Sequence, residues 1–96
     1  MLFALICTDK PSSLDLRLSV RPDHLKYLES LGGALKAAGP FTDDNGQPTG
    51  SLVVIEAADA AAAKAMADAD PYAVAGLFAS VDIRPWKWLI RNPEAK

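Results

Sequence analysis

The sequence predicts an α+β domain with the ferredoxin-like order strand, helix, strand, strand, helix, strand. Three observations support this order. Residues 2–8 are a short, unbroken apolar run, which is typical of a buried strand. Leu25, Leu28 and Leu31 recur at helical spacing, and residues 52–55 are the β-branched and apolar run expected of a central strand. In this fold the helices cover one face of a four-stranded antiparallel sheet.

The first helical region is expected to be interrupted at Pro22. Ser12 stands three residues before Asp15, a weak capping box that can start a helical turn through residues 14–18. Proline lacks an amide hydrogen and fits the first position of a helix, so we expect a new helix to open at Pro22. The glycine pair at 32–33 ends that helix, because glycine accepts the left-handed conformation.

The rest of the chain alternates strands, turns and an alanine-rich helix. Asp59 and Asp70 each stand before a helical segment and are expected to cap it. The expected elements, in chain order, are a strand at 34–39, a polar loop at 40–50, a strand at 51–57, a helix at 59–69, a short helix through 73–77, a strand at 81–90 and a loose tail at 92–96. Residues 1–96 therefore form one domain.

Composition narrows the class of protein. Half of the 96 residues are hydrophobic and the net charge is −2, so neither a disordered chain nor a nucleic-acid partner is expected. The apolar start at 1–7 lacks a basic flank and is too short to span a bilayer. We therefore expect a cytoplasmic protein with no membrane partner. The one cysteine, Cys7, is expected to be a buried thiol.

The first and third strands are apolar on both sides, although helices cover only one face of the predicted sheet. Leaving the second face in water would expose a larger apolar patch than monomers usually carry. We therefore expect a homodimer joined through the sheet, with a crevice between sheet and helices.

His24, the only histidine, and Asp70 are the candidate catalytic pair. A carboxylate and an imidazole in contact can move a proton near neutral pH. His24 is expected in the first turn of its helix, where free backbone amides favour the neutral imidazole. Capping alone would explain Asp70, and a half-buried histidine bonded to a carbonyl would explain His24. A carboxylate has two oxygens, so capping and pairing are compatible.

Three further residues are candidates for contact with a substrate. Arg21 carries a guanidinium fork that fits a carboxylate, Ser51 is a possible hydrogen-bonding group in the cleft, and Tyr72 follows Asp70 closely. Arg17 is expected to be solvated. One histidine and one cysteine make a zinc site uncommon, and no glycine-rich phosphate loop is present, so no metal and no cofactor are expected.

Several short motifs occur together in one order. They are Arg21-Pro22-Asp23-His24-Leu25, Ala38-Gly39-Pro40, Gly50-Ser51, Ala67-Asp68-Ala69-Asp70-Pro71-Tyr72 and Ile83-Arg84-Pro85-Trp86. This combination resembles the YciI-like family over nearly the whole chain. The resemblance implies a dimeric ferredoxin-like fold related to dimeric α/β-barrel enzymes such as muconolactone isomerases. It also implies a histidine–aspartate site, which maps onto His24 and Asp70.

Two functions remain open at this point. The first is a cofactor-independent enzyme with acid/base chemistry of the isomerase or lyase type, such as elimination on a small organic or aromatic metabolite. The second is a non-catalytic dimeric domain that binds a small ligand or serves as an accessory module. Fold alone does not decide between them. Contact between His24 and Asp70 inside a cleft favours the enzyme.

Overall fold

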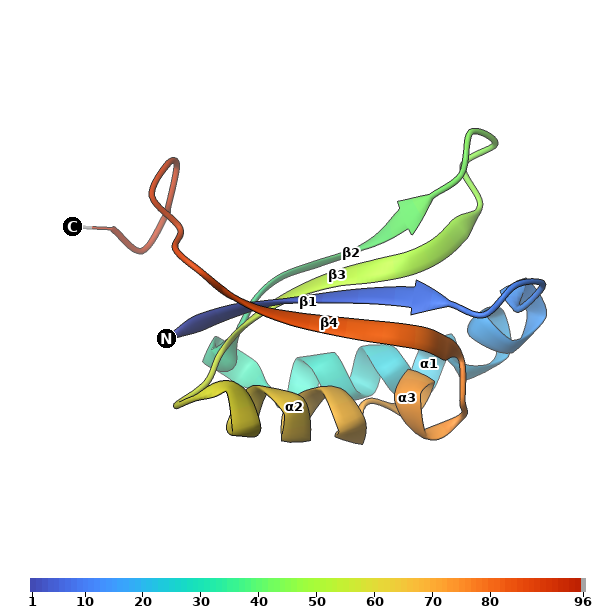
Figure 1. Cartoon of the computed structure of the whole chain (residues 1–96), viewed down its shortest axis with the longest axis horizontal. Coiled ribbons are helices and arrows are strands. Elements are labelled where there is room, and N and C mark those ends of the chain that lie inside the picture. Colours follow the sequence, from blue (N-terminus) through green and yellow to red (C-terminus); the bar gives the residue numbers. More distant parts are fainter. Residues whose placement is uncertain (96) are drawn as a thin grey trace.

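One antiparallel four-stranded sheet carries all the helices on the same face (Figure 1). The computed structural model describes residues 1–95, so residue 96 of the expected tail lies outside the described residues. The elements are β1 (Leu2–Asp9), α1 (Leu14–Ser30), a 3₁₀ turn (Gly32–Ala34), β2 (Leu35–Thr42), β3 (Pro48–Glu56), α2 (Ala60–Ala69), α3 (Pro71–Val74) and β4 (Phe78–Trp86). The order β2-β3-β1-β4 confirms the predicted ferredoxin-like α+β fold.

The core lies between the sheet and the helices. Alternate residues of β1 point toward the helices and are buried, as are their neighbours on β3. The core of the strands is formed by Phe3, Leu5, Cys7, Val53 and Ile55. The helices complete it with residues that include Leu28, Ala63 and Ala67.

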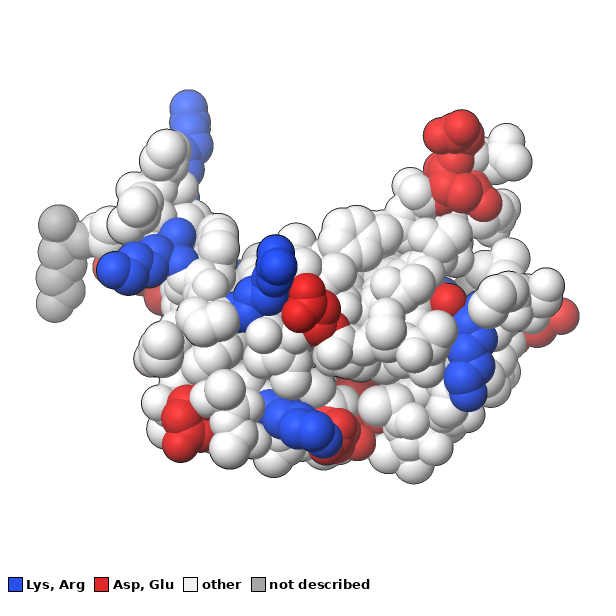
Figure 2. Space-filling model, viewed as in Figure 1, with Lys and Arg blue, Asp and Glu red and all other residues white. Residues whose placement is uncertain are grey.

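The opposite sheet surface, here called the open face, has no helix on it. The register places on it Leu2, Ala4, Ile6, Phe41 and Leu52. Phe41 is 43% exposed and the other four are half-buried. Figure 2 shows this side as a hollowed surface of mostly uncharged atoms between the tip of the β2–β3 hairpin and the C-terminal segment, with one basic and one acidic side chain near its middle. The register also places on the open face the ion pair of Arg84 with Asp82 on β4. The expectation that β1 is buried on both faces is therefore met on one face only in the single chain.

α1 continues through Pro22, so the expected interruption at this residue is wrong. Proline removes one helical hydrogen bond and crowds the preceding turn. Pro22 itself is exposed, and the rest of the helix is held against the core from its other side. The buried residues of α1 are Arg17, His24 and Leu28. Tertiary packing on both sides of the proline thus outweighs the local cost.

The helix ends follow local sequence signals with one exception. Asp59 accepts a hydrogen bond from the Ala62 amide, which confirms it as the cap of α2. Gly32 takes a positive φ of 56° directly after α1, as expected of a glycine terminator. At the start of α1, however, Ser13 is the N-cap residue and makes no side-chain capping bond, so the expected role of Ser12 is wrong.

Strand lengths differ from the sequence prediction because pairing decides them. β2 extends through Pro40, which the sequence placed in a loop, because an edge strand tolerates a residue without an amide hydrogen. β4 begins at Phe78 and ends at Trp86, which pairs with Leu2, the first residue of its antiparallel partner β1. Gly50 on β3 is required, because any Cβ there would collide with the Cys7 carbonyl.

Residues 92–95, expected to be a loose tail, form a turn. The Asn92 side-chain amide donates to the Trp88 carbonyl. Glu94 lies 2.9 Å from the ammonium of Lys36 on β2. Within the described residues no helix is long and apolar enough to cross a membrane.

Cys7 is a buried thiol, as expected, with 4% of its surface exposed. Burial, together with the negative charges of Asp70 and Asp9, raises its pKa to about 12. The thiol is therefore protonated at neutral pH and is a packing residue of the core rather than a nucleophile.

Replacing Pro22 by alanine should stabilise the protein. The change restores an amide donor inside a continuous helix, which stabilises the folded state. It also makes the unfolded chain more flexible, which opposes this gain, and the net increase in the free energy of unfolding should be about 1–2 kcal/mol. Urea unfolding of Pro22→Ala measures the difference. Asp23→Ala, at the next exposed position, is the matched control and should change stability by less than about 0.7 kcal/mol. A Pro22→Ala variant no more stable than wild type would contradict this account of α1.

Candidate functional site

His24 and Asp70 meet between α1 and the start of α3. The imidazole Nδ1 lies 2.9 Å from each oxygen of the carboxylate. Both side chains are 9% exposed, so water competes little with the contact. The two residues are 46 positions apart in sequence, and the fold brings them together as predicted.

Asp70 fixes the proton arrangement of His24. A carboxylate only accepts hydrogen bonds, so Nδ1 must donate, and the neutral ring then carries its proton on Nδ1. Nε2 is left with a free lone pair. No buried side-chain nitrogen or oxygen lacks a partner in the described part of the chain, so Nε2 must be accessible to solvent or ligand. His24 is therefore arranged as a proton acceptor at Nε2.

The expected position of His24 in the first turn of a helix is wrong. α1 begins at Leu14, so His24 lies near the middle of the helix. The free amides of a helix N-terminus act only within the first turn and do not reach it. The tautomer of His24 is set by Asp70 instead.

Asp70 also caps α3, as the sequence predicted. Its Oδ1 accepts a hydrogen bond from the Tyr72 amide at 2.9 Å, while Pro71 occupies the first position of the helix. The same carboxylate thus holds His24 and fixes the backbone of Tyr72. Capping and pairing occur together.

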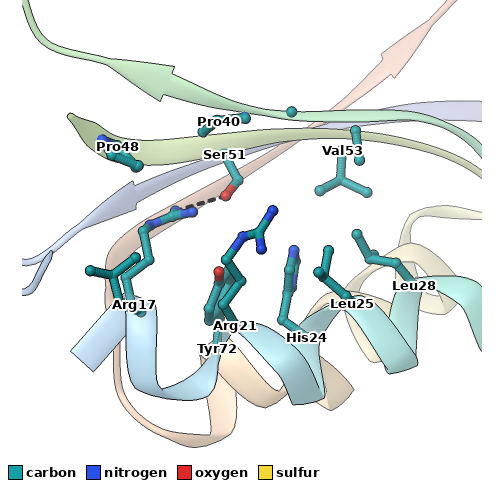
Figure 3. Close-up of a pocket in the computed structure, with 13 residues that line it drawn as sticks. Arg17, Arg21, His24, Leu25, Leu28, Pro40, Pro48, Ser51, Val53 and Tyr72 are labelled. Atoms are coloured by element: carbon teal, nitrogen blue, oxygen red, sulfur yellow. Dashed lines mark hydrogen bonds between the residues drawn. The ribbon is translucent and has the colours of Figure 1, made fainter. Parts of the chain in front are cut away.

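Tyr72 packs against the histidine. Its ring stacks on His24 with centroids 3.9 Å apart and planes 16° apart. The guanidinium carbon of Arg17 lies 4.7 Å from the centroid of the Tyr72 ring, and Figure 3 shows Tyr72 between Arg17 and His24. Burial raises the pKa of Tyr72, although the charges of Arg17 and Arg21 oppose the shift. The phenol is therefore neutral near pH 7 and can donate a hydrogen bond.

Arg17 is buried, and the expectation that it is solvated is wrong. Its Nε donates to Asp9 Oδ2 at 2.7 Å and its Nη2 donates to Asp9 Oδ1 at 3.0 Å, a bidentate pair. Nη2 also donates to Ser51 Oγ at 2.8 Å. Burial by itself lowers the pKa of Arg17, but the hydrogen bond and charge of Asp9 outweigh it and the pKa is raised. Arg17 remains charged and links α1 to both β1 and β3.

These side chains border a cavity of about 210 Å³ between α1 and the β2–β3 hairpin (Figure 3). The polar residues that line it are Arg17, Arg21, His24, Ser51 and Tyr72. Its apolar walls include Leu25, Leu28, Pro40, Pro48 and Val53. All the sequence-predicted substrate-binding residues therefore line one cavity. Asp70 lies behind His24 and is not among the lining residues.

The arrangement supports proton transfer and hydrogen bonding to a small molecule. Nε2 of His24 can accept a proton, the Tyr72 hydroxyl can donate a hydrogen bond, and Arg21 supplies positive charge. No cluster of three or more histidine, cysteine or carboxylate side chains suited to a metal ion occurs in residues 1–95.

The sequence reasoning missed Arg17 and Asp9 as parts of the site. A signal was present in the spacing, because residues 17, 21 and 24 lie four and three positions apart and share one face of a continuous helix. Because the sequence prediction ended one helix before Pro22 and began another there, it placed Arg17 and His24 on different helices. Asp9 gave no local signal, because only the fold places the end of β1 against Arg17.

Asp70→Ala should destabilise the protein more than the loss of an ordinary helix cap. It removes the cap of α3 and leaves the His24 Nδ1–H without a partner, which together cost about 2–4 kcal/mol. The matched control is Asp59→Ala, which removes only the exposed cap of α2 and should cost about 1 kcal/mol. Equal losses in chemical denaturation would show that the bond between His24 and Asp70 contributes no stability.

Comparison with known proteins identifies the family. The model of the YCII-related domain matches residues 1–87. The chain is 44% identical over 95 residues to protein YciI of Escherichia coli O6:H1, covering 91% of this chain and 97% of the relative. Protein YciI of Shigella flexneri matches equally well.

Two solved structures place the fold among known proteins. The 5-chloro-2-hydroxyhydroquinone dehydrochlorinase TftG of Burkholderia phenoliruptrix, solved with 2,5-dihydroxybenzoquinone, superposes with a TM-score of 0.83. The two chains are 34% identical, and the match covers 91% of this chain and 94% of the dehydrochlorinase. A NIPSNAP family protein of Agrobacterium tumefaciens, at a TM-score of 0.59 and 16% identity over 98% of this chain and 97% of its own, shares the fold alone. The family match and the YciI relatives show that this chain belongs to the YCII-related domain family.

Proposed function

We propose that the protein is a small-molecule enzyme in which His24 and Asp70 form an acid/base pair for isomerase or lyase-type chemistry. The observation that carries this proposal is the 2.9 Å contact of Nδ1 with Asp70, which leaves Nε2 free beside a lined cavity. The similarity to a dehydrochlorinase supports an elimination, because that relative at 34% identity is named for the loss of hydrogen chloride.

In the proposed elimination, Nε2 of His24 takes a proton from a hydroxyl group or an activated carbon of the substrate. The electron pair of the broken bond forms a new double bond, and the leaving group departs with its own bonding pair. The imidazolium that forms is stabilised by Asp70, which keeps its negative charge. The proton then passes to solvent. In an isomerisation the same proton would return to a different carbon.

The other cavity residues would position the substrate. Tyr72 is a neutral phenol whose pKa burial raises further, and it donates a hydrogen bond to an oxygen on which negative charge develops. Ser51 already accepts from Arg17, so its hydroxyl hydrogen is free to donate toward a ligand. Pockets that hold drug-sized ligands measure about 300–1,000 Å³. A cavity of about 210 Å³ therefore favours a molecule of one small ring.

His24→Gln should lower the rate of the proposed reaction by about 10²- to 10⁴-fold, because it removes the proton acceptor. The assay screens small hydroxylated, halogenated and lactone ring compounds for halide release and for carbon–hydrogen exchange in D₂O. Asp23→Asn, next to His24 in sequence but exposed, is the control and should keep full activity.

The proposal of an enzyme would be contradicted if wild type accelerated none of these reactions and His24→Gln behaved identically. Ligands that bind without turnover in that case would favour the alternative, a small-ligand-binding dimeric domain with a structural His24 and Asp70.

We further propose that two copies join through the open face. Half-buried aliphatic side chains on β1 and β3, with exposed Phe41 beside them, form an apolar surface that a second sheet would cover. Leu52→Glu places a charge in this surface and should convert a dimer to a monomer in light scattering. Val74→Glu, on α3 and already 76% exposed, is the matched control and should leave the mass unchanged. A monomeric wild type would contradict the dimer.

A further inference from the structure

We infer that the ligand of this cavity is a small organic anion, a carboxylate or an ionised enol, whose charged oxygens bind the guanidinium of Arg21. The inference deepens the proposed function, since it rests on the same cavity and names the chemical class of its ligand.

The first argument is the charge balance of the cavity. The guanidinium of Arg17 is neutralised by Asp9 in a bidentate pair, and His24 faces the carboxylate of Asp70. Arg21 lines the same cavity, but it has no carboxylate within ion-pair distance in the described residues. The walls therefore carry one uncompensated positive charge, and it belongs to Arg21.

The second argument is the direction of the Arg21 side chain. Arg21 lies between Arg17 and His24 on one face of α1, and Figure 3 shows its guanidinium rising from the helix toward β3. Arg21 and Tyr72 line the same cavity. Burial raises the pKa of Tyr72, and the charge of Arg21 is among those that oppose this shift. Arg21 is exposed, so its guanidinium lines the cavity and can also be reached by a ligand that enters from solvent.

The third argument is the chemistry of the surrounding donors. A guanidinium presents parallel N–H groups that match two oxygens in a plane, as in a carboxylate or a conjugated enolate. The Tyr72 hydroxyl adds a further donor, and Leu25, Leu28 and Val53 offer an apolar wall for the body of a ring. Nε2 of His24 then lies beside a bound anion. Positive charge at Arg21 would also favour the enolate that proton removal creates.

The test compares anions with a neutral analogue of the same shape. Benzoate and benzamide differ mainly in charge, and 2,5-dihydroxybenzoquinone is an acidic enol, a vinylogous carboxylic acid, that is already ionised at neutral pH. Binding of all three is measured by calorimetry and by amide NMR shifts for wild type, Arg21→Gln and Arg21→Lys. Lys26→Gln removes the same charge from an exposed position of α1 and is the matched control.

Benzoate or the ionised enol should bind wild type more tightly than benzamide does. Arg21→Gln should lower the affinity for the anion by about tenfold or more, because a charged hydrogen bond is lost. Arg21→Lys should restore part of that affinity, and Lys26→Gln should bind as wild type does. The two anions separate the two sources of charge, since the one that loses more affinity in Arg21→Gln identifies the preferred group.

Three results would overturn the inference: equal affinity of wild type for benzoate and benzamide with no binding of the enol, unchanged anion binding in a folded Arg21→Gln variant, or shifts that map away from the cavity. These results are separate from the proposed function. The His24→Gln variant should still bind the anion, because binding does not need the proton acceptor. If wild type binds the anion but catalyses no reaction, the proposed enzymatic function is refuted and the inference about the anion stands. Turnover of a neutral substrate at full rate by Arg21→Gln refutes the anion alone.

Discussion

The candidate site depends on the two hydrogen bonds that the Asp70 carboxylate accepts. The carboxylate accepts them from the Tyr72 amide and from His24 Nδ1, and so joins the start of α3 to the middle of α1. The capping bond to the Tyr72 amide fixes the direction of the carboxylate, and the carboxylate in turn fixes the tautomer of His24. The stack of Tyr72 on His24 follows from the same contact. One side chain thus couples a local helix signal to the arrangement of a proton acceptor.

A second polar link holds the other end of the cavity. Arg17 joins α1 to the end of β1 through Asp9 and to β3 through Ser51. A buried ion pair of this kind contributes little net stability, but removing one partner leaves an unpaired charge in the interior. Its main effect is geometric, because it fixes the distance between helix and sheet at the mouth of the cavity. Arg21 lies between the two links and keeps its charge free for a ligand.

The fold and the site carry different information about function. The NIPSNAP family protein shares the fold at only 16% identity, so the fold by itself does not indicate a function. The inference of proton transfer instead comes from the histidine–aspartate geometry and from the cavity beside it. The similarity to a dehydrochlorinase at 34% identity agrees with that inference without naming a substrate for this chain.

The sequence by itself determined the features that depend on near neighbours. The succession of strands and helices and the caps at Asp59 and Asp70 followed from local patterns, since capping and alternation act within a few residues. The pairing of His24 with Asp70, 46 positions apart, was instead expected from the chemistry of the two side chains and from the family resemblance. Only the tertiary structure decided that α1 continues through Pro22, because packing on both sides outweighs a local penalty of about 3 kcal/mol. That continuity places Arg17 on the same face as His24. The burial of such a charge depends on a partner strand, which no neighbouring residue reveals.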